Sequence, residues 1–364
     1  MNRRTFLSAG LVPFLPRLSA AAESGGWDAA VRVLDDAVAR GEVQAASLFL
    51  SVAGVRQSRV FGLAKTEGAP FLLGSITKPV CVAAVMTLFD EGAFRLDDPL
   101  ARFFPEFRGM GREGITIRQL LTHVSGLPDQ LPDNRALRSR HAPLSEFVAE
   151  SLRLAPAFSP GTKYEYSSMG ILLACAVAEK ISGTPIVPFV TEKILKPLKM
   201  TRSALGLGEL GEAEVVAVQT DRAAPESGAG DPAARDWDWN SRYWRTLGAP
   251  WGGLHASAAD VGTFLDEFLA NRGVILRPET ERLMIGNHNG VGLTPRGLGF
   301  SVGPAAGGPG VKGASDRAFG HTGSTGTLAW ADPATETICV VLTSLPARAV
   351  DPHPRDLAAR AISE

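Results

Sequence analysis

The chain has only three cysteines among its 364 residues. This small odd number excludes a disulfide framework as the basis of the fold. Because Cys81, Cys175 and Cys339 each lie inside an apolar run, we expect them to be buried free thiols. The six histidines are scattered, and neither H-E-x-x-H nor C-x-x-C occurs. Without metal-ligand spacing we expect no metal and no cofactor.

A charge of one sign is also lacking, since the net charge is −1 and the isoelectric point is about 6.6. There is therefore no basic surface that would indicate nucleic acid or an anionic membrane as a partner. No apolar run is long enough to span a bilayer, so we expect no stable membrane insertion once the N-terminal leader is removed. The balance is that of a globular protein, and we expect a monomer that acts on a small molecule.

Residues 1–22 have the pattern of a twin-arginine signal peptide. The segment Asn2–Leu7 contains the arginine pair, a short apolar stretch follows to Leu15, and small residues occupy 19–22. This order predicts a bacterial protein that is exported already folded, to the periplasm or the medium. A disordered basic terminus is the alternative. Residues 23–364 then form the mature domain.

Strand patterns lie at the two ends of that domain, and helical patterns fill its middle. We expect helices at Trp27–Arg40 and Pro354–Ile362, strands at Ala46–Val52, Ser58–Leu63, Leu328–Ala331 and Thr337–Thr343, and mostly helix from Ser75 to Ile194. This order is not an alternating β-α-β series. It predicts an α/β (α+β) fold in which an antiparallel sheet from both termini is flanked by helices. The sheet subdomain would comprise about 27–73 and 297–364, and a mostly helical inserted subdomain about 74–296.

A connection rich in proline, glycine and alanine spans residues 221–236 and predicts a long surface loop. It leads into four of the six tryptophans, Trp237, Trp239, Trp244 and Trp251. So dense a cluster is either a small separate core or the aromatic wall of a pocket. The sequence leaves both interpretations open.

The segment Ser75-Ile76-Thr77-Lys78 begins an apolar helix and carries the strongest chemical signal. A serine and a lysine three residues apart project from one helix face. Ser75 lies near the helix N-terminus, where free N–H groups favour a developing anion, and Pro79 fits a first turn. A lysine on a buried helix has a lowered pKa, so it can take the proton of the serine. In the alternative, Ser75 only caps the helix and Lys78 extends to solvent.

Two further motifs follow in order, Tyr164–Ser168 before an apolar helix and Gly320–Gly326 before a hairpin. With Ser75 and Lys78 they form the set S-x-x-K, Y-x-S and H-T-G. The chain thereby resembles the serine β-lactamase and penicillin-binding protein superfamily, and within it the class C β-lactamases and family VIII esterases. Residues 120–127 and 252–260 also resemble family phrases. The resemblance implies a β-lactamase/transpeptidase-like fold.

The same resemblance implies that Ser75 is acylated and that Lys78 helps to activate it. Tyr166 would act as general base and later as proton donor to the leaving group, and Tyr164 is its only nearby competitor. A tyrosine close to two cations is expected to have a lowered pKa. The N–H groups of Ser75 and Ser324 would form the oxyanion hole.

The substrate-binding positions implied by the resemblance are Ser168, His321, Thr322 and Gly323, the last two on a strand edge along the site. Two of them depart from the lactamase pattern, which has asparagine at Ser168 and lysine at His321. A serine offers no amide to a substrate carbonyl. A histidine is mostly neutral at pH 7 and is expected to gain charge towards pH 6.

Both departures weaken recognition of β-lactams, whereas the residues for acylation are all present. The sequence therefore favours an exported hydrolase of esters or small amides. A β-lactamase or D-alanyl-D-alanine carboxypeptidase is one alternative, and a catalytically silent binding protein is another. His123 and Ser125 could pose as a catalytic pair, but Gly126 and Pro128 beside them favour a loop-capping role.

Overall fold

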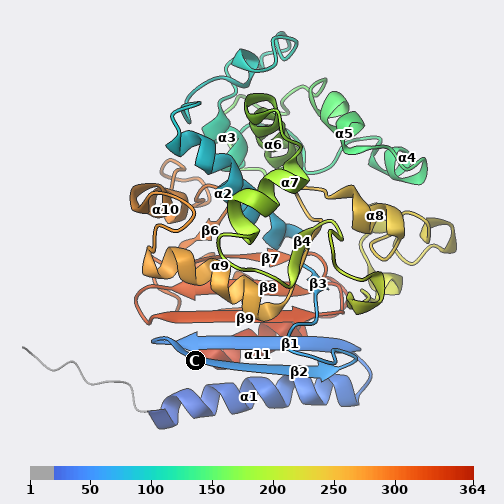
Figure 1. Ribbon diagram of the computed structural model, residues 1–364, viewed down its shortest axis with the longest axis vertical. Helices are drawn as coiled ribbons and strands as arrows, with labels where there is room; N and C mark the ends of the chain where they lie inside the picture. Colours follow the sequence, from blue (N-terminus) through green and yellow to red (C-terminus); the bar gives the residue numbers. More distant parts are fainter. Residues whose placement is uncertain (1–19) are drawn as a thin grey trace, which may run out of the picture.

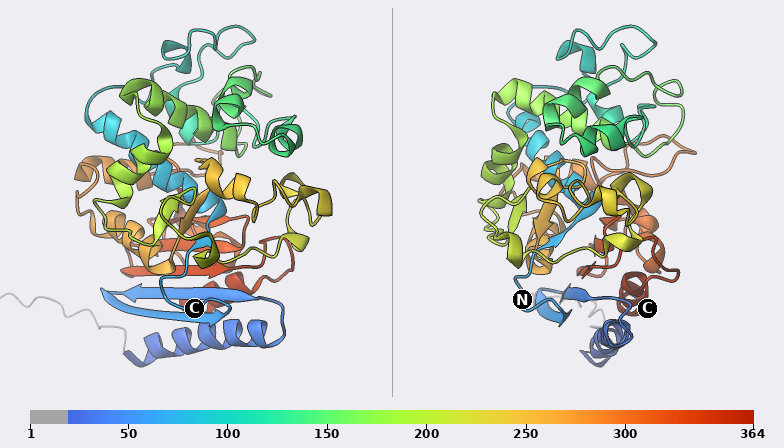
Figure 2. Two further views of the ribbon diagram at one scale, coloured as in Figure 1. Left: turned by 45° about the vertical axis from the view of Figure 1, so that its right-hand side comes forward. Right: turned by 90° about the vertical axis from the view of Figure 1, so that its right-hand side faces the viewer.

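A computed structural model describes residues 20–364 (Figure 1). Of the predicted twin-arginine signal peptide (residues 1–22), residues 1–19 lie outside the described residues and residues 20–22 begin the helix α1 (Ala20–Ala39). The main element of the described chain is a six-stranded antiparallel sheet, with helices on both of its faces and a larger helical region beyond one edge (Figures 1 and 2). The strands of this sheet are β1 (Ala45–Val52), β2 (Val55–Gly62), β6 (Ser301–Val302), β7 (Phe319–Gly323), β8 (Thr327–Asp332) and β9 (Thr337–Thr343).

The strand order β2-β1-β9-β8-β7-β6 brings the two ends of the chain together, as expected from the sequence. β1 pairs with β9 in the antiparallel register Ala46↔Thr343 to Val52↔Thr337. Every residue of β9 is buried because both faces of the strand are covered. The expected hairpin of β8 and β9, with its turn after Asp332, is confirmed.

Alternate residues of the central strands pack against different helices. Leu48 and Val341 belong to the apolar cluster that includes Leu34 of α1 (Ala20–Ala39) and Ala358 of α11 (Pro354–Ser363). Residues on the opposite face, such as Val340, belong to the cluster that includes Phe264 and Phe268 of α9 (Ala258–Ala270). The period of two in side-chain direction thus places one helical layer on each face of the sheet.

The helical region is built around α2 (Thr77–Asp90), which is buried on all sides from Thr77 to Leu88. Its other helices are α3 (Ile117–Leu121), α4 (Asn134–Ser139), α5 (Leu144–Ser151), α6 (Ser168–Ser182), α7 (Ile186–Val190), α8 (Arg242–Leu247) and α10 (Pro278–Ile285). The expected N-cap at Thr116 is confirmed, with a capping box to Gln119. Gly183 ends α6 in the left-handed conformation (φ 68°), which suits a residue without a Cβ.

Two elements cross the subdomain boundaries expected from the sequence. β3 (Phe71–Leu72) does not join the six-stranded sheet but a second sheet of order β3-β5-β4, with β4 (Ser203–Leu205) and β5 (Leu254–Ala256). Conversely, α9 comes from the expected helical part yet covers the main sheet. The sheet and helical parts therefore share one continuous core. The predicted loop 221–236 contains only short 3₁₀ turns such as Pro225–Ser227 and Pro232–Ala234.

Within the described residues, no single helix has the length and apolar character needed to cross a membrane; the bent pair Ser168–Ser182 and Ile186–Leu195 meets these criteria only when taken together.

Candidate active site

Ser75 lies in a 3₁₀ turn (Gly74–Ile76) that leads directly into α2. This turn points the partly exposed serine into a pocket of ≈ 380 Å³. Lys78, one turn later, is fully buried and its Nζ lies 2.9 Å from Ser75 Oγ. The i, i+3 spacing therefore brings the amine to the hydroxyl, as the sequence predicted, and the alternative of a lysine extending to solvent is wrong.

The environment of Lys78 favours the neutral amine. Burial lowers the pKa of Lys78 to about 7, and the nearby charge of Arg296 acts in the same direction. Nζ also donates to the carbonyl oxygen of Trp251 at 2.8 Å. In the neutral amine, the nitrogen lone pair is then free to accept the proton of Ser75.

Tyr166 completes this group from the loop before α6. Its ring lies 4.8 Å from Lys78 Nζ and 5.6 Å from the guanidinium of Arg296, so the two expected cations are present. Nevertheless, burial raises the pKa of Tyr166 above its ordinary value, against the opposing charge of Arg296 and a hydrogen bond with Ser75. The expected lowered pKa is therefore wrong, because loss of water around the hydroxyl outweighs the two cations. Tyr166 is protonated at neutral pH, ready to donate.

Tyr164, the competing tyrosine, is not among the residues that line this pocket. Burial raises its pKa as well. The structure thus brings Tyr166, and not Tyr164, into the pocket that contains Ser75.

Arg296 is a site residue that the sequence analysis missed. Its buried guanidinium donates from Nη2 to Nε2 of His321 at 3.1 Å, and the same nitrogen lies 3.0 Å from Nε2 of His123. His123 in turn accepts from the N–H of Ser167 at 3.1 Å, and its ring packs at a tilt of 37° against the Tyr166 ring, with the centroids 4.4 Å apart. Arg296 and His123 together hold the loop that carries Tyr166. No motif marks Arg296 in the sequence.

His321 lies on β7 and is almost fully buried. Its Nδ1–H donates to the carbonyl oxygen of Thr322 at 2.7 Å, and its Nε2 accepts from Arg296, with the Tyr166 hydroxyl 3.4 Å away. Burial, Arg296 and Lys78 hold the pKa of His321 well below its ordinary value. The expectation that His321 gains charge towards pH 6 is therefore wrong, because a proton on it would face two neighbouring cations.

The two segments that carry the expected oxyanion donors lie close together. A Cβ on Gly74 would lie 3.1 Å from the backbone nitrogen of Ser324, and Gly74 has a φ of +55°. This close approach requires glycine. Gly323, before Ser324, is equally constrained, since a Cβ there would lie 2.2 Å from the carbonyl oxygen of Leu73. Among the described residues, no hydrogen-bond acceptor faces the Ser324 N–H.

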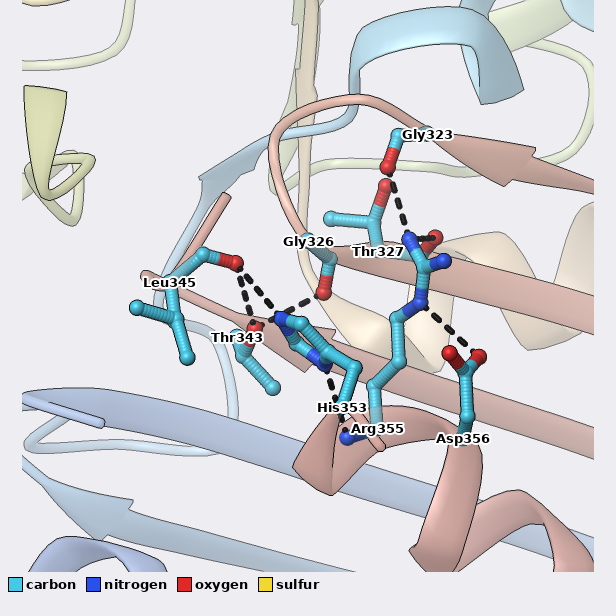
Figure 3. A network of polar contacts seen from close by, with 8 residues as sticks. All are labelled: Gly323, Gly326, Thr327, Thr343, Leu345, His353, Arg355 and Asp356. Carbon is cyan, nitrogen blue, oxygen red and sulfur yellow. Dashed lines mark hydrogen bonds and ion pairs between the residues drawn. The ribbon is translucent and has the colours of Figure 1, made fainter. Parts of the chain in front are cut away.

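The turn that carries Ser324 is held from behind by Arg355 of α11 (Figure 3). The buried guanidinium donates to the carbonyl oxygens of Gly323 at 2.9 Å and Thr327 at 3.1 Å. A neighbouring carboxylate, Asp356, accepts from its Nε at 3.1 Å. Arg355 therefore fixes the strand end at which the Ser324 N–H meets the pocket.

The remaining predicted substrate-binding positions also line the pocket. Thr322 is partly exposed on the β7 edge. Ser168 is buried, and its hydroxyl donates to Asp129 Oδ1 at 2.5 Å. Because Asp129 also lines the pocket, an acidic group faces a ligand at the position where the lactamase pattern has an amide.

Tryptophans form another part of the pocket lining. Trp239, Trp244 and Trp251 line it and also belong to a small separate apolar cluster, so both interpretations of the tryptophan-rich segment are correct for these three. Trp237 is buried but does not line the pocket. We call Ser75, Tyr166, His321 and Ser324, together with Lys78 buried behind Ser75, the catalytic wall. Arg138, Trp239, Trp244 and Trp251 are the tryptophan wall.

Two other serines use their hydroxyls in other hydrogen bonds, although Ser301 also lines the pocket. Ser125 is buried and its hydroxyl accepts from the N–H of Leu127, which confirms the loop-capping interpretation. Ser301 lies in the letters G-x-S-x-G at 299–303, but on an edge strand and not at a strand-to-helix turn. Its hydroxyl accepts from Arg296 Nη1.

Comparisons with known proteins agree with this arrangement. Residues 30–363 match the Beta-lactamase family, and the chain belongs to it. It is 29% identical to Esterase EstB of Burkholderia gladioli over 331 residues, which cover 81% of this chain and 82% of that protein. The chain is a serine hydrolase of this superfamily.

Two solved structures share the fold. A penicillin-binding protein homologue from Caulobacter crescentus has a TM-score of 0.74 at 21% identity, covering 92% of this chain and 96% of the other. EstA from Arthrobacter nitroguajacolicus has a TM-score of 0.70 at 20% identity, covering 93% and 96%. The α/β fold expected from the sequence is thus confirmed.

Proposed function

We propose that the protein hydrolyses esters or small amides through an acyl-enzyme on Ser75. The observation that carries this proposal is the buried Lys78, whose amine lies 2.9 Å from Ser75 Oγ and has a pKa of about 7. Such an amine is neutral in a large fraction of molecules at pH 7 and can act as the base for the serine.

In the first half-reaction, Ser75 Oγ attacks the carbonyl carbon and its proton passes to Lys78. The negative charge that develops on the carbonyl oxygen is stabilised by the N–H groups of Ser75 and Ser324, each worth about 3 kcal/mol. When the tetrahedral intermediate collapses, the leaving oxygen or nitrogen takes the proton of Tyr166, and Lys78 returns its proton to Tyr166.

In the second half-reaction, water attacks the acyl group on Ser75. Its proton passes through Tyr166 and Lys78 to the departing serine oxygen, which regenerates the enzyme and releases the carboxylic acid. At the start of the cycle Tyr166 is thus the proton donor and Lys78 is the first base. These roles follow because the pKa of Tyr166 is raised and the pKa of Lys78 is lowered.

Recognition favours an ester over a β-lactam. A β-lactam carries a carboxylate close to the bond that is broken, and His321, which occupies the position of the lysine in the lactamase pattern, is buried and neutral. A β-lactamase or D-alanyl-D-alanine carboxypeptidase remains the second candidate, because the family includes enzymes that act on such substrates and the acylation residues are all present.

An activity panel tests the choice. Short p-nitrophenyl esters should be hydrolysed, whereas a chromogenic cephalosporin and a peptide ending in D-Ala-D-Ala should be turned over slowly or not at all. Efficient cephalosporin hydrolysis by the wild type at pH 8 would overturn the ester preference. Absence of turnover and of covalent labelling on every substrate would favour the silent binding protein.

We further propose that the protein works as a monomer outside the cytoplasm, after export by the twin-arginine route. The support is the arginine pair and apolar stretch of residues 2–15. Replacing Arg3 and Arg4 by lysine in the full chain should retain the protein in the cytoplasm of a bacterial host, as cell fractionation would detect.

A further inference from the structure

Arg138, in α4, is a buried arginine without a partner. Its side chain is 2% exposed, and neither Nε nor Nη1 has a hydrogen-bond acceptor among the described residues. No carboxylate of the described chain forms an ion pair with it. A buried charge without a partner is strongly unfavourable, so a native fold rarely keeps one unless another group binds there.

The guanidinium of Arg138 lines the same pocket as Ser75. It stacks on the indole of Trp244, with its central carbon 3.9 Å from the ring centroid. Trp244 in turn lies close to the nucleophile: a Cβ on Gly252 would lie 3.9 Å from both Trp244 Cζ2 and the Gly74 backbone. A pocket ligand that reaches from Ser75 along Trp244 therefore meets Arg138.

The other arginines of the pocket differ from Arg138. Arg296 and Arg355 are buried, but both donate to protein acceptors, His321 and the carbonyl oxygens of Gly323 and Thr327 respectively. Arg348 is exposed, so water can solvate its charge. Of these four, only Arg138 combines burial with the lack of any acceptor in the described chain.

Two further observations indicate which group Arg138 would bind. The indole N–H of Trp244 is also buried without an acceptor among the described residues, so two neighbouring donors both need one. Burial lowers the pKa of Arg138 to about 10, with Tyr243 and Glu226 opposing, and the group is still charged at neutral pH. A carboxylate has two acceptor oxygens, so it can accept from a guanidinium and from an indole N–H at the same time.

We propose, building on the proposed ester hydrolysis, that Arg138 and Trp244 bind a carboxylate of the substrate that is remote from the bond attacked by Ser75. The substrates are then half-esters of dicarboxylic acids, or esters whose alcohol part carries a distant carboxylate. A substrate carboxylate beside the reacting bond would meet His321, which is neutral. A substrate carboxylate at the tryptophan wall would meet the charged guanidinium of Arg138. The subsite thus selects where along the substrate the charge lies.

Two matched substrate pairs test this assignment. Mono-p-nitrophenyl adipate and p-nitrophenyl hexanoate differ by a carboxylate on the acyl side, and 4-carboxyphenyl butyrate and phenyl butyrate differ by one on the alcohol side. In at least one pair, Arg138→Met should lower kcat/KM for the charged ester about tenfold or more, through KM, and change the neutral ester less than about threefold.

The control variant is Arg348→Gln, which removes the same charge from an exposed position on the same pocket. It should leave the preference for the charged ester nearly intact. Equal losses on charged and neutral esters in Arg138→Met, or a selective loss in Arg348→Gln, would overturn the assignment. Glu226→Gln should strengthen binding of the charged ester, because it removes a nearby carboxylate.

Binding without turnover separates this inference from the proposed function. In Ser75→Ala, adipate should quench tryptophan fluorescence saturably, inorganic phosphate should compete weakly, and the additional Arg138→Met change should abolish the response. If adipate binds in this way but the wild type hydrolyses no ester, ester hydrolysis is refuted and the subsite is kept. Absence of adipate binding, or binding that ignores Arg138, would refute the subsite. If Arg138→Met does not fold, as judged by thermal unfolding, Arg138→Lys replaces it, with a partial loss expected.

Discussion

The two walls of the pocket treat their buried polar groups differently. On the catalytic wall, Lys78, Tyr166 and His321 each contact a protein group at hydrogen-bonding distance, and burial decides their protonation. On the tryptophan wall, Arg138 and Trp244 keep donors without acceptors among the described residues. The difference indicates that the side chains of the catalytic wall find their partners within the protein and can pass protons among themselves. The tryptophan wall is open and requires a ligand to complete it.

The largest expected effect is that of Ser75→Ala, because Ser75 is the proposed nucleophile of the catalytic wall. Ester turnover should fall by about 10⁴-fold or more, as for loss of other serine nucleophiles. Ser125→Ala is the matched control, since Ser125 only caps a loop. Steady-state kinetics on p-nitrophenyl butyrate measures both variants. Comparable losses in the two would contradict the assignment of Ser75.

Tyr166→Phe should cut kcat by roughly 10²–10⁴-fold, because the leaving group loses its proton donor. The ring remains packed against His123, so the melting temperature should change little. The same measurements on Tyr164→Phe provide the control. If that variant were the damaged one, the proton donor would lie two residues earlier in the chain.

The next prediction concerns pH. Since the pKa of Lys78 is lowered to about 7, the neutral amine disappears below that pH. The value of kcat/KM should therefore fall about tenfold per unit below pH 7 and level off above it. His321 stays neutral, so His321→Asn should not move this acid limb. A rate that declines between pH 7 and 9 would show that the charged lysine is the active form.

A smaller effect is expected behind the oxyanion turn. Arg355→Met leaves the reacting groups in place. It removes the hydrogen bonds from the guanidinium to the carbonyl oxygens of Gly323 and Thr327, which lie before and after Ser324 in the chain. We expect kcat to fall by about tenfold with little change in KM, less than for outright loss of an oxyanion donor. A thermal unfolding curve checks stability. A change in KM alone would show that Arg355 acts on substrate binding and not on the oxyanion donors.

The sequence could predict those parts of the catalytic wall that depend on local spacing. Ser75 and Lys78 lie on one helical turn, and Tyr166 stands in a recognisable motif, so their meeting needed no knowledge of the fold. The raised pKa of Tyr166 could not be predicted, since its sign depends on whether burial outweighs two cations. Arg296 was missed because it joins His123 and His321 only through the tertiary fold.

The tryptophan wall was predicted less completely. Four neighbouring tryptophans indicated an aromatic cluster, but not which side of it faces a ligand. Arg138 lies between Arg135 and Arg140, a run that is typical of a solvated helix face. Arg135 and Arg140 are indeed exposed, whereas Arg138 turns inwards onto Trp244. Burial, and not residue type, distinguishes the three.

The most direct test of the central claim is to locate the covalent adduct formed with a fluorophosphonate probe. Trypsin cleaves after Lys65 and Arg95 but not at Lys78-Pro79, so Ser75 lies in the peptide 66–95, whereas Ser125 lies in 119–135. Tandem mass spectrometry should place one adduct on Ser75, formed several-fold more slowly at pH 6 than at pH 8. An adduct on Ser125 or Ser301, or none on Ser75, would contradict the account.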